Sequence, residues 1–135
     1  MALNPHLADA AASAAADAIS ALANSGKLEL YTGTQPANAN TAPGVGNTLL
    51  VTLTMNATAF GAAVAGVLTA NAIASGNAVA SGTATWWRLF KSDGTTPLVD
   101  GSVGTGANYN AVMNSAAIVS GATVAISAFV LTITE

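Results

Sequence analysis

The chain contains no cysteine and very few charged residues. The lack of cysteine excludes disulfide bonds, thiol chemistry and cysteine metal sites, and it leaves the redox compartment open. Charged residues make up 7% of the 135 residues, against about 25% in an average soluble protein. Lysine and arginine occur only at Lys27, Arg88 and Lys91, so no basic patch is available to neutralise phosphates. We therefore expect no nucleic-acid partner.

Hydrophobic residues, alanine included, make up 52% of the sequence, which argues against intrinsic disorder. With so little charge, the surface must consist largely of Thr, Ser, Asn, Ala and Gly. Freely soluble monomers normally carry interspersed charges that oppose association. We therefore expect this protein to function in contact with other protein chains. Its length fits one domain with one hydrophobic core.

The N-terminus shows neither a signal peptide nor a membrane span. No cationic segment precedes the alanine-rich stretch, and that stretch carries Asp9 and Asp17. We therefore expect no membrane partner.

Residues 4–25 have the composition of a helix, because alanine is the best helix former. Asn4 is a suitable N-cap, Pro5 suits the first helical position, and Gly26 supplies a stop. The domain division we predict is a helical segment at 1–26 followed by a β-domain at 27–135. The helix either covers the sheet of its own domain or reaches onto a neighbouring subunit. Its predicted apolar stripe consists of Leu3, Leu7, Ala11, Ala15, Ile19 and Leu22.

After Gly26 the hydrophobic period changes from helical to alternating. The last segment has apolar residues on both faces, which predicts a central or doubly covered strand. Short strands separated by turn residues are typical of an antiparallel β-sandwich of jelly-roll or Greek-key type. The predicted strands are 27–31, 48–55, 67–74, 83–91, 97–103, 107–113 and 121–135.

The segment 33–47 is rich in Gly, Pro, Asn and Thr and has no periodicity, so we predict a long surface loop. Ordered loops of this length are often functional. We therefore select the loop and the apolar side of the helix as candidate partner contacts. The residues chosen are Leu3, Leu7, Gln35, Pro36, Asn38, Asn40 and Pro43.

The stretch 83–94, TATWWRLFKSDG, gathers most of the rare residues of the chain. Together with 97–103 it predicts a hairpin whose turn lies at 92–95. Alternation places Trp86 and Trp87 on opposite faces, where we predict that both are core anchors. With a three-residue turn, Arg88 lies opposite Asp100, and Phe90 lies opposite Leu98. The predicted structural pair is therefore Arg88 and Asp100.

The sequence offers few candidate residues for catalysis or for cofactor binding. His6 is the only histidine, and we expect it to be a solvent-facing residue of the first helical turn. Asp93 and Asp100 flank the hairpin, but Asp93 precedes Gly94 as turn-forming aspartates do. A calcium site there lacks further acids. We expect no enzyme activity, no metal, no cofactor and no small-molecule substrate.

Four segments, 30–42, 49–55, 59–73 and 81–104, together resemble small structural proteins encoded among the head and tail genes of tailed bacteriophages. They include LYTGTQPANANTA at 30–42 and SGTATWWRLFKSDGTTPLVDGSVG at 81–104. The resemblance implies a virion component present in many copies and made in the cytoplasm of a bacterial host, foremost a capsid decoration or cement protein on the outer capsid surface. Its implied partners are the major capsid protein and copies of itself, with a trimer suited to local three-fold positions.

Two other functions are also compatible with the sequence. A tail, baseplate or fibre-associated subunit follows from the same resemblance. A carbohydrate-binding β-sandwich module is the alternative from another class, and it requires that Trp86 or Trp87 be exposed in the isolated domain.

Overall fold

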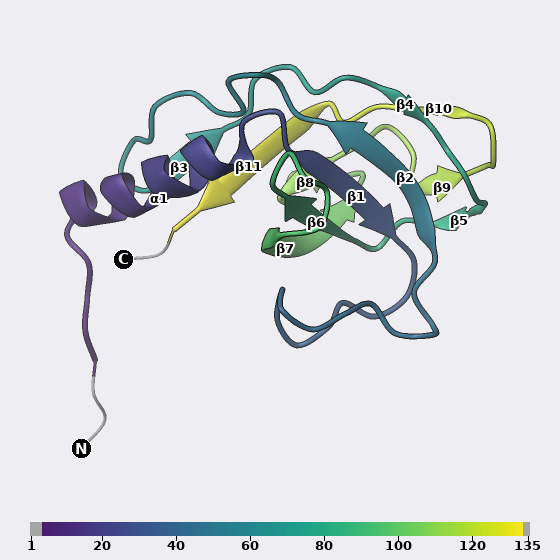
Figure 1. Cartoon of the computed structure of the whole chain (residues 1–135), viewed down its shortest axis with the longest axis horizontal. Helices are drawn as coiled ribbons and strands as arrows, with labels where there is room; N and C mark the ends of the chain where they lie inside the picture. Colours follow the sequence, from purple (N-terminus) through teal and green to yellow (C-terminus); the bar gives the residue numbers. More distant parts are fainter. Residues whose placement is uncertain (1–3, 134–135) are drawn as a thin grey trace.

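A computed structural model describes residues 4–133 and shows a mainly β protein with one helix. The helix lies beside β3 and β11 at one end of the molecule, and the short strands β4, β5, β9 and β10 lie at the opposite end (Figure 1). The elements are α1 (Asp9–Ala23), β1 (Lys27–Tyr31), β2 (Leu49–Thr54), β3 (Val67–Thr69), β4 (Gly76–Asn77), β5 (Gly82–Thr83), β6 (Trp86–Phe90), β7 (Pro97–Gly104), β8 (Ala111–Val112), β9 (Ala117–Ile118), β10 (Thr123–Val124) and β11 (Ala128–Thr132).

Seven strands form one mixed sheet in the order β2-β1-β6-β7-β8-β11-β3. All its neighbours are antiparallel except β7 and β8, where Val103 pairs with Ala111 and Gly104 with Val112 in parallel. The expectation of a wholly antiparallel sheet is therefore wrong at this pair. Because the overlap is only two residues long, the short 105–110 connection is enough to return the chain. Two further pairs, β4 with β10 and β5 with β9, form two-stranded ribbons.

The predicted strands at 27–31, 48–55, 83–91 and 97–103 correspond to β1, β2, β6 and β7. The other three predicted strands are too long. Only β3 forms within 67–74 and only β8 within 107–113, and the predicted strand 121–135 is divided into β10 and β11. The last strand is also not covered on both faces: Phe129 and Leu131 are buried, while Ala128 and Thr132 are exposed. Apolar composition alone had suggested double burial there.

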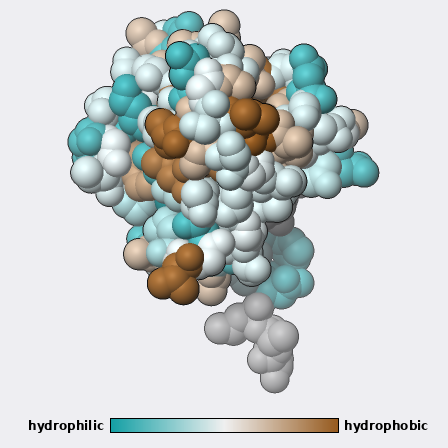
Figure 2. Space-filling model, turned by 90° about the vertical axis from the view of Figure 1, so that its right-hand side faces the viewer, coloured by the Kyte–Doolittle hydropathy of each residue, from teal (hydrophilic) through white to brown (hydrophobic). Residues whose placement is uncertain are grey.

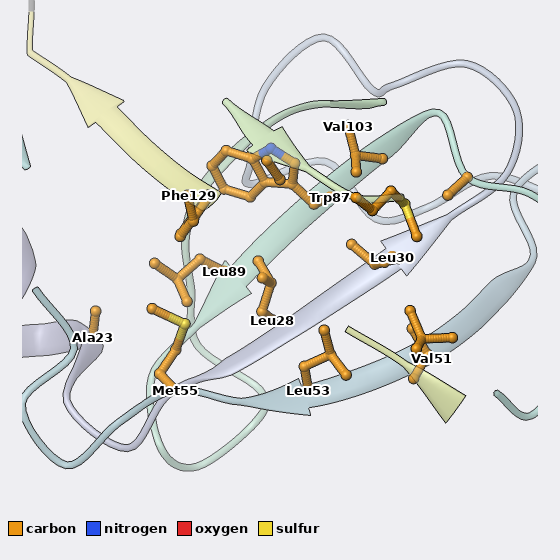
Figure 3. Close-up of a cluster of buried hydrophobic side chains, with 14 of the residues drawn as sticks. Ala23, Leu28, Leu30, Val51, Leu53, Met55, Trp87, Leu89, Val103 and Phe129 are labelled. Atoms are coloured by element: carbon orange, nitrogen blue, oxygen red, sulfur yellow. The ribbon is translucent and has the colours of Figure 1, made fainter. Parts of the chain in front are cut away.

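The hydrophobic core lies on one face of the large sheet (Figure 3). It receives leucines and valines from β1 and β2, Trp87 and Leu89 from β6, and Phe129 from β11. The Trp87 and Phe129 rings meet edge to face, with centroids 4.7 Å apart, a geometry that aromatic pairs favour. Trp87 also donates a 2.9 Å hydrogen bond from Nε1 to the Ser102 carbonyl, so its polar atom is satisfied inside the core.

The helix begins at Asp9 and not at the predicted Asn4–Pro5 cap. Ala8 occupies the N-cap with an extended backbone and no side-chain cap, while residues 4–8 are exposed. An isolated helical turn is marginal without tertiary contacts, and the exposed residues 4–8 make few of them. At the other end Ser25 takes the positive φ of 54°. Gly26 is required for space, since a Cβ there would lie 2.5 Å from the Phe90 carbonyl oxygen.

The helix also turns a different face inward from the one predicted. Ala12, Ala16 and Ala23 are fully buried, whereas Leu7 and Leu22 remain 43% and 46% exposed. The approach is too close for larger side chains: a Cβ on Gly66 would already lie 3.1 Å from that of Ala12. Small side chains therefore face the domain, and the leucines face solvent.

Polar side chains of the helix complete its attachment. Asp17 Oδ1 accepts a 2.8 Å bond from the Ala63 amide, Asn24 Oδ1 accepts one of 2.8 Å from Ala59, and Ser13 Oγ accepts one of 3.2 Å from Gly66. These bonds satisfy backbone N–H groups of the 59–66 connection, which otherwise lack strand partners. The helix is thus part of the domain surface in the single chain.

Candidate functional site

The most structured polar cluster of the molecule is centred on Arg88 of β6. Arg88 lies directly opposite Asp100 of β7, and its Nη2 is 2.8 Å from Asp100 Oδ2. Their side chains are only 3% and 9% exposed. The strand register next to this pair differs from the prediction, because a bulge between Leu89 and Phe90 places Phe90 opposite Pro97 in place of Leu98.

Aromatic rings support the guanidinium from one side. The Arg88 Cζ lies 5.2 Å from the centroid of the Trp86 ring, and Trp86 stacks on Tyr31 at 4.4 Å with an angle of 9° between the planes. Trp86 Nε1 donates a 3.1 Å hydrogen bond to the Thr32 carbonyl. A cation over a tryptophan face is attracted by the ring quadrupole, so this stack fixes the position of the guanidinium.

Tyr31 connects the cluster to a second carboxylate, that of Glu29. Its hydroxyl donates to Glu29 Oε2. Burial of the ring, and then this hydrogen bond to a carboxylate, raise the pKa of Tyr31 above its ordinary value. The phenol therefore remains protonated and acts as a hydrogen-bond donor, which is a structural role.

Arg88 and Asp100 together hold the 33–47 loop against the sheet. Arg88 Nη1 donates to the Thr41 carbonyl at 2.8 Å, and its Nη2 also donates to the Asn38 carbonyl at 3.3 Å. Gln35 Nε2 donates to Asp100 Oδ1 at 2.8 Å. The buried ion pair thus contacts the loop at three separate points. Within residues 4–133, only Nε of the Arg88 side chain has no partner.

The loop is also ordered by its own side chains. Asn38 Oδ1 accepts from the amides of Asn40 and Thr41 and from the Thr41 hydroxyl. Asn47 closes the base, since its Nδ2 donates to the carbonyls of Thr32 and Thr34, and its Oδ1 accepts from Gly44. Between these supports Val45 is fully exposed. The arrangement presents an exposed apolar side chain on a backbone that is held in place.

The predicted partner-contact residues fall into two groups. In the loop, Gln35, Asn38 and Asn40 are exposed, and Pro36 and Pro43 are half-buried. Leu7 is exposed but precedes the helix, and Leu3 lies outside the described residues. The exposed part of Asn38 coexists with a carbonyl bound to Arg88, so this residue belongs to both the surface and the support.

Both tryptophans are interior residues, with Trp86 1% and Trp87 0% exposed. They line opposite faces of β6, Trp87 in the main core and Trp86 under the Arg88 cluster. A sugar platform made of either tryptophan needs an accessible ring face, and neither ring has one, so the condition for the carbohydrate-binding alternative is not met. The ring faces are occupied by Phe129 and Tyr31.

The two hairpin acids serve separate local structures. Asp93 accepts hydrogen bonds from the amides of Thr95 and Thr96 and from the Thr96 hydroxyl. These bonds stabilise the ionised form and lower the pKa of Asp93 to about 2. Asp100 is occupied by Arg88 and Gln35. The two carboxylates therefore form no shared acid pair, and His6 lies in the exposed segment before the helix.

Residues 4–133 contain no group of three or more His, Asp or Glu side chains placed to hold a metal ion. No helix within this range is long and apolar enough to cross a membrane.

Sequence reasoning treated the Arg88–Asp100 pair and the 33–47 loop as independent features. It missed that Gln35 and the backbone of Asn38 and Thr41 bind the pair, and that Asn47 closes the loop. One signal was available: the chain has a single arginine, and the strand pattern placed it on a tryptophan-rich strand. A buried guanidinium there needs more acceptors than one carboxylate provides.

Comparison with protein-family models, with curated proteins and with solved structures found no match to this chain.

Proposed function

We propose that this chain is a non-enzymatic structural protein of a tailed-bacteriophage virion, a capsid decoration protein that binds the major capsid protein and stabilises the head. The assignment to virions rests on the sequence resemblance at 30–42, 49–55, 59–73 and 81–104. We further propose that the large sheet and the two ribbons act as the layers of a sandwich. Copies of the chain bind side by side on the outer capsid surface.

One observation carries the contact role: the 33–47 loop is uncharged, largely exposed and held by a buried ion pair. A loop fixed before binding loses little conformational entropy when it meets a partner. Because it bears no charge, no ion must be desolvated at the interface. These properties fit a permanent contact between protein subunits and have no evident use in catalysis.

Other parts of the surface have the same character. Figure 2 shows separate hydrophobic patches among near-neutral residues on the face opposite the helical end. Val45 is one of several exposed valines; the others are Val64, Val79 and Val119. Such a surface can approach symmetric copies closely without burying unpaired charge. By linkage, a protein that binds the assembled shell and not free subunits stabilises the shell.

The test uses heads of the phage that encodes the chain, prepared without this protein and then incubated with purified wild type. We expect co-sedimentation with heads and a higher temperature of head disruption. Val45→Asp places a charge on the exposed side of the loop and should weaken head binding at least tenfold, about 1.4 kcal/mol. Val64→Asp is the matched control, because Val64 is also exposed but lies beside the helix, and it should bind as wild type does.

Three results are decisive against this assignment or part of it. Binding of wild type to isolated tails and not to heads would move the protein to the tail. Loss of binding in Val64→Asp with retention in Val45→Asp would transfer the contact to the helical end. Absence of wild-type binding to every virion part would overturn the virion role.

A further inference from the structure

A groove on the outer face of the sheet shares no residue with the Arg88 cluster. It has a volume of about 620 Å³ and lies between the 105–110 connection and the outward side chains of β8 and β11. This volume falls in the range of about 300–1,000 Å³ that ligand sites usually occupy. Val112 and Val130 form part of its apolar floor.

Tyr109 forms one wall of the groove and is 42% exposed. Its ring rests on Gly104, where a built Cβ would overlap the ring atoms. The missing side chain at position 104 is therefore what allows the ring to lie in this place. An aromatic face held by the backbone below it is a ready surface for stacking.

Neutral polar side chains surround this ring. Asn108, Thr105 and Thr132 line the groove, and their side chains make no hydrogen bond within residues 4–133. The Asn110 side chain differs, since its Nδ2 donates a 3.4 Å hydrogen bond to the Val130 carbonyl. The groove thus offers one fixed aromatic face with amide and hydroxyl groups available beside it.

The chemistry of the lining selects a class of ligand. No lining residue is charged, so the groove offers no partner for a phosphate, an acid or an amine. Strands β8 and β11 each have a neighbour on both sides in the sheet, so an extended peptide has no free backbone edge to extend. An apolar floor, an aromatic face and neutral donors and acceptors remain. They match the C–H faces and hydroxyl groups of a sugar.

We propose that this groove binds a neutral saccharide, with the sugar ring stacked on Tyr109 and hydrogen bonded by Asn108. This site is independent of the proposed virion contact and does not use the 33–47 loop.

The experiment is an NMR titration of the ¹⁵N-labelled full chain with maltohexaose, cellohexaose, tetra-N-acetylchitotetraose and 3′-sialyllactose, each up to about 20 mM, a range that reaches millimolar Kd values. We expect saturable shifts at 105–110 and 128–132 with at least one neutral saccharide. Tyr109→Ala should weaken that binding at least tenfold, whereas Tyr109→Phe should stay within about threefold of wild type. Gly104→Ala should weaken saccharide binding too, because the added methyl group displaces the Tyr109 ring while leaving the ring itself in the protein. The spectrum of each variant without sugar establishes that it is folded.

The proposal is overturned if none of the three neutral saccharides gives saturable shifts in the groove, or if Tyr109→Ala binds as wild type does. A preference for 3′-sialyllactose would contradict the neutral class. Equal shifts with an uncharged extended peptide would show a peptide groove instead. Val45→Asp should leave sugar binding unchanged, which separates this site from the loop contact.

Discussion

The 33–47 loop and helix α1 both lie at the surface, but they are attached to the domain in different ways. The loop is held by a buried ion pair that reaches it at Gln35, Asn38 and Thr41. The helix is held by fully buried alanines and by neutral or exposed side chains that accept bonds from the 59–66 backbone. A few strong directional contacts position the loop, whereas close packing over a length of chain positions the helix.

The difference explains how each region tolerates change. Removing one partner of a buried pair leaves a charge without compensation, which costs about 3–5 kcal/mol. Enlarging a side chain in a close-packed contact costs about 1–3 kcal/mol. Removing one hydrogen bond near solvent costs least, because water replaces the lost partner. The predictions below follow that order.

The largest effect is expected for Asp100→Ala, which leaves Arg88 buried with no carboxylate. We expect a loss of about 3–5 kcal/mol in the free energy of unfolding, measured by denaturant titration. Hydrogen exchange at the Thr41 amide should accelerate as well, because the loop loses the Gln35 contact. Asp100→Asn keeps an acceptor and should lose less; if it loses nothing, the charge of the pair does not contribute.

The helix contact is tested by Ala16→Leu. Ala16 is fully buried, so we expect a loss of about 1–3 kcal/mol from overpacking, seen as a lower denaturant midpoint. Leu22→Ala is the matched change on the outer side and should stay within about 0.5 kcal/mol of wild type. The reverse pattern would mean that the leucine stripe faces the domain.

A smaller effect is expected for Asp17→Ala, which removes the acceptor of the Ala63 amide. We expect a loss of about 0.5–1 kcal/mol, reduced by the higher helix propensity of alanine. Hydrogen exchange at Ala63 should become faster. Asp17→Asn retains the Oδ1 acceptor and should restore slow exchange; if exchange there is unchanged in Asp17→Ala, the bond is not formed in solution.

The smallest effect concerns Asp93, a fully exposed carboxylate that serves as a reference outside both regions. Its pKa is lowered from 3.8 to about 2 in the folded chain. The carboxylate therefore contributes to stability at every pH above its ordinary pKa. That contribution is lost as the pH falls through about 2. The stability difference between wild type and Asp93→Asn should be constant above about pH 5 and shrink below pH 4. A constant difference down to pH 2 would contradict the lowered pKa.

Local patterns succeeded where one short segment decides its own structure. The alternation in 27–31 predicted β1, and the Asp-Gly turn led to the register that opposes Arg88 and Asp100. They failed where a distant segment decides. The bulge after Leu89 moved Phe90 onto Pro97, and the long C-terminal strand was divided at 125–127, where both the amide and the hydroxyl of Ser127 bind the Val112 carbonyl.

The sequence by itself determined that this is a weakly charged, mainly β chain with one alanine-rich helix and an uncharged 33–47 loop. These properties depend on composition and on short-range periodicity, which any chain carries before it folds. Only the tertiary structure decided which face of the helix is buried and which acceptors share Arg88. Each of these depends on the distance between segments far apart along the chain, and close packing fixes that distance only when the whole core is assembled.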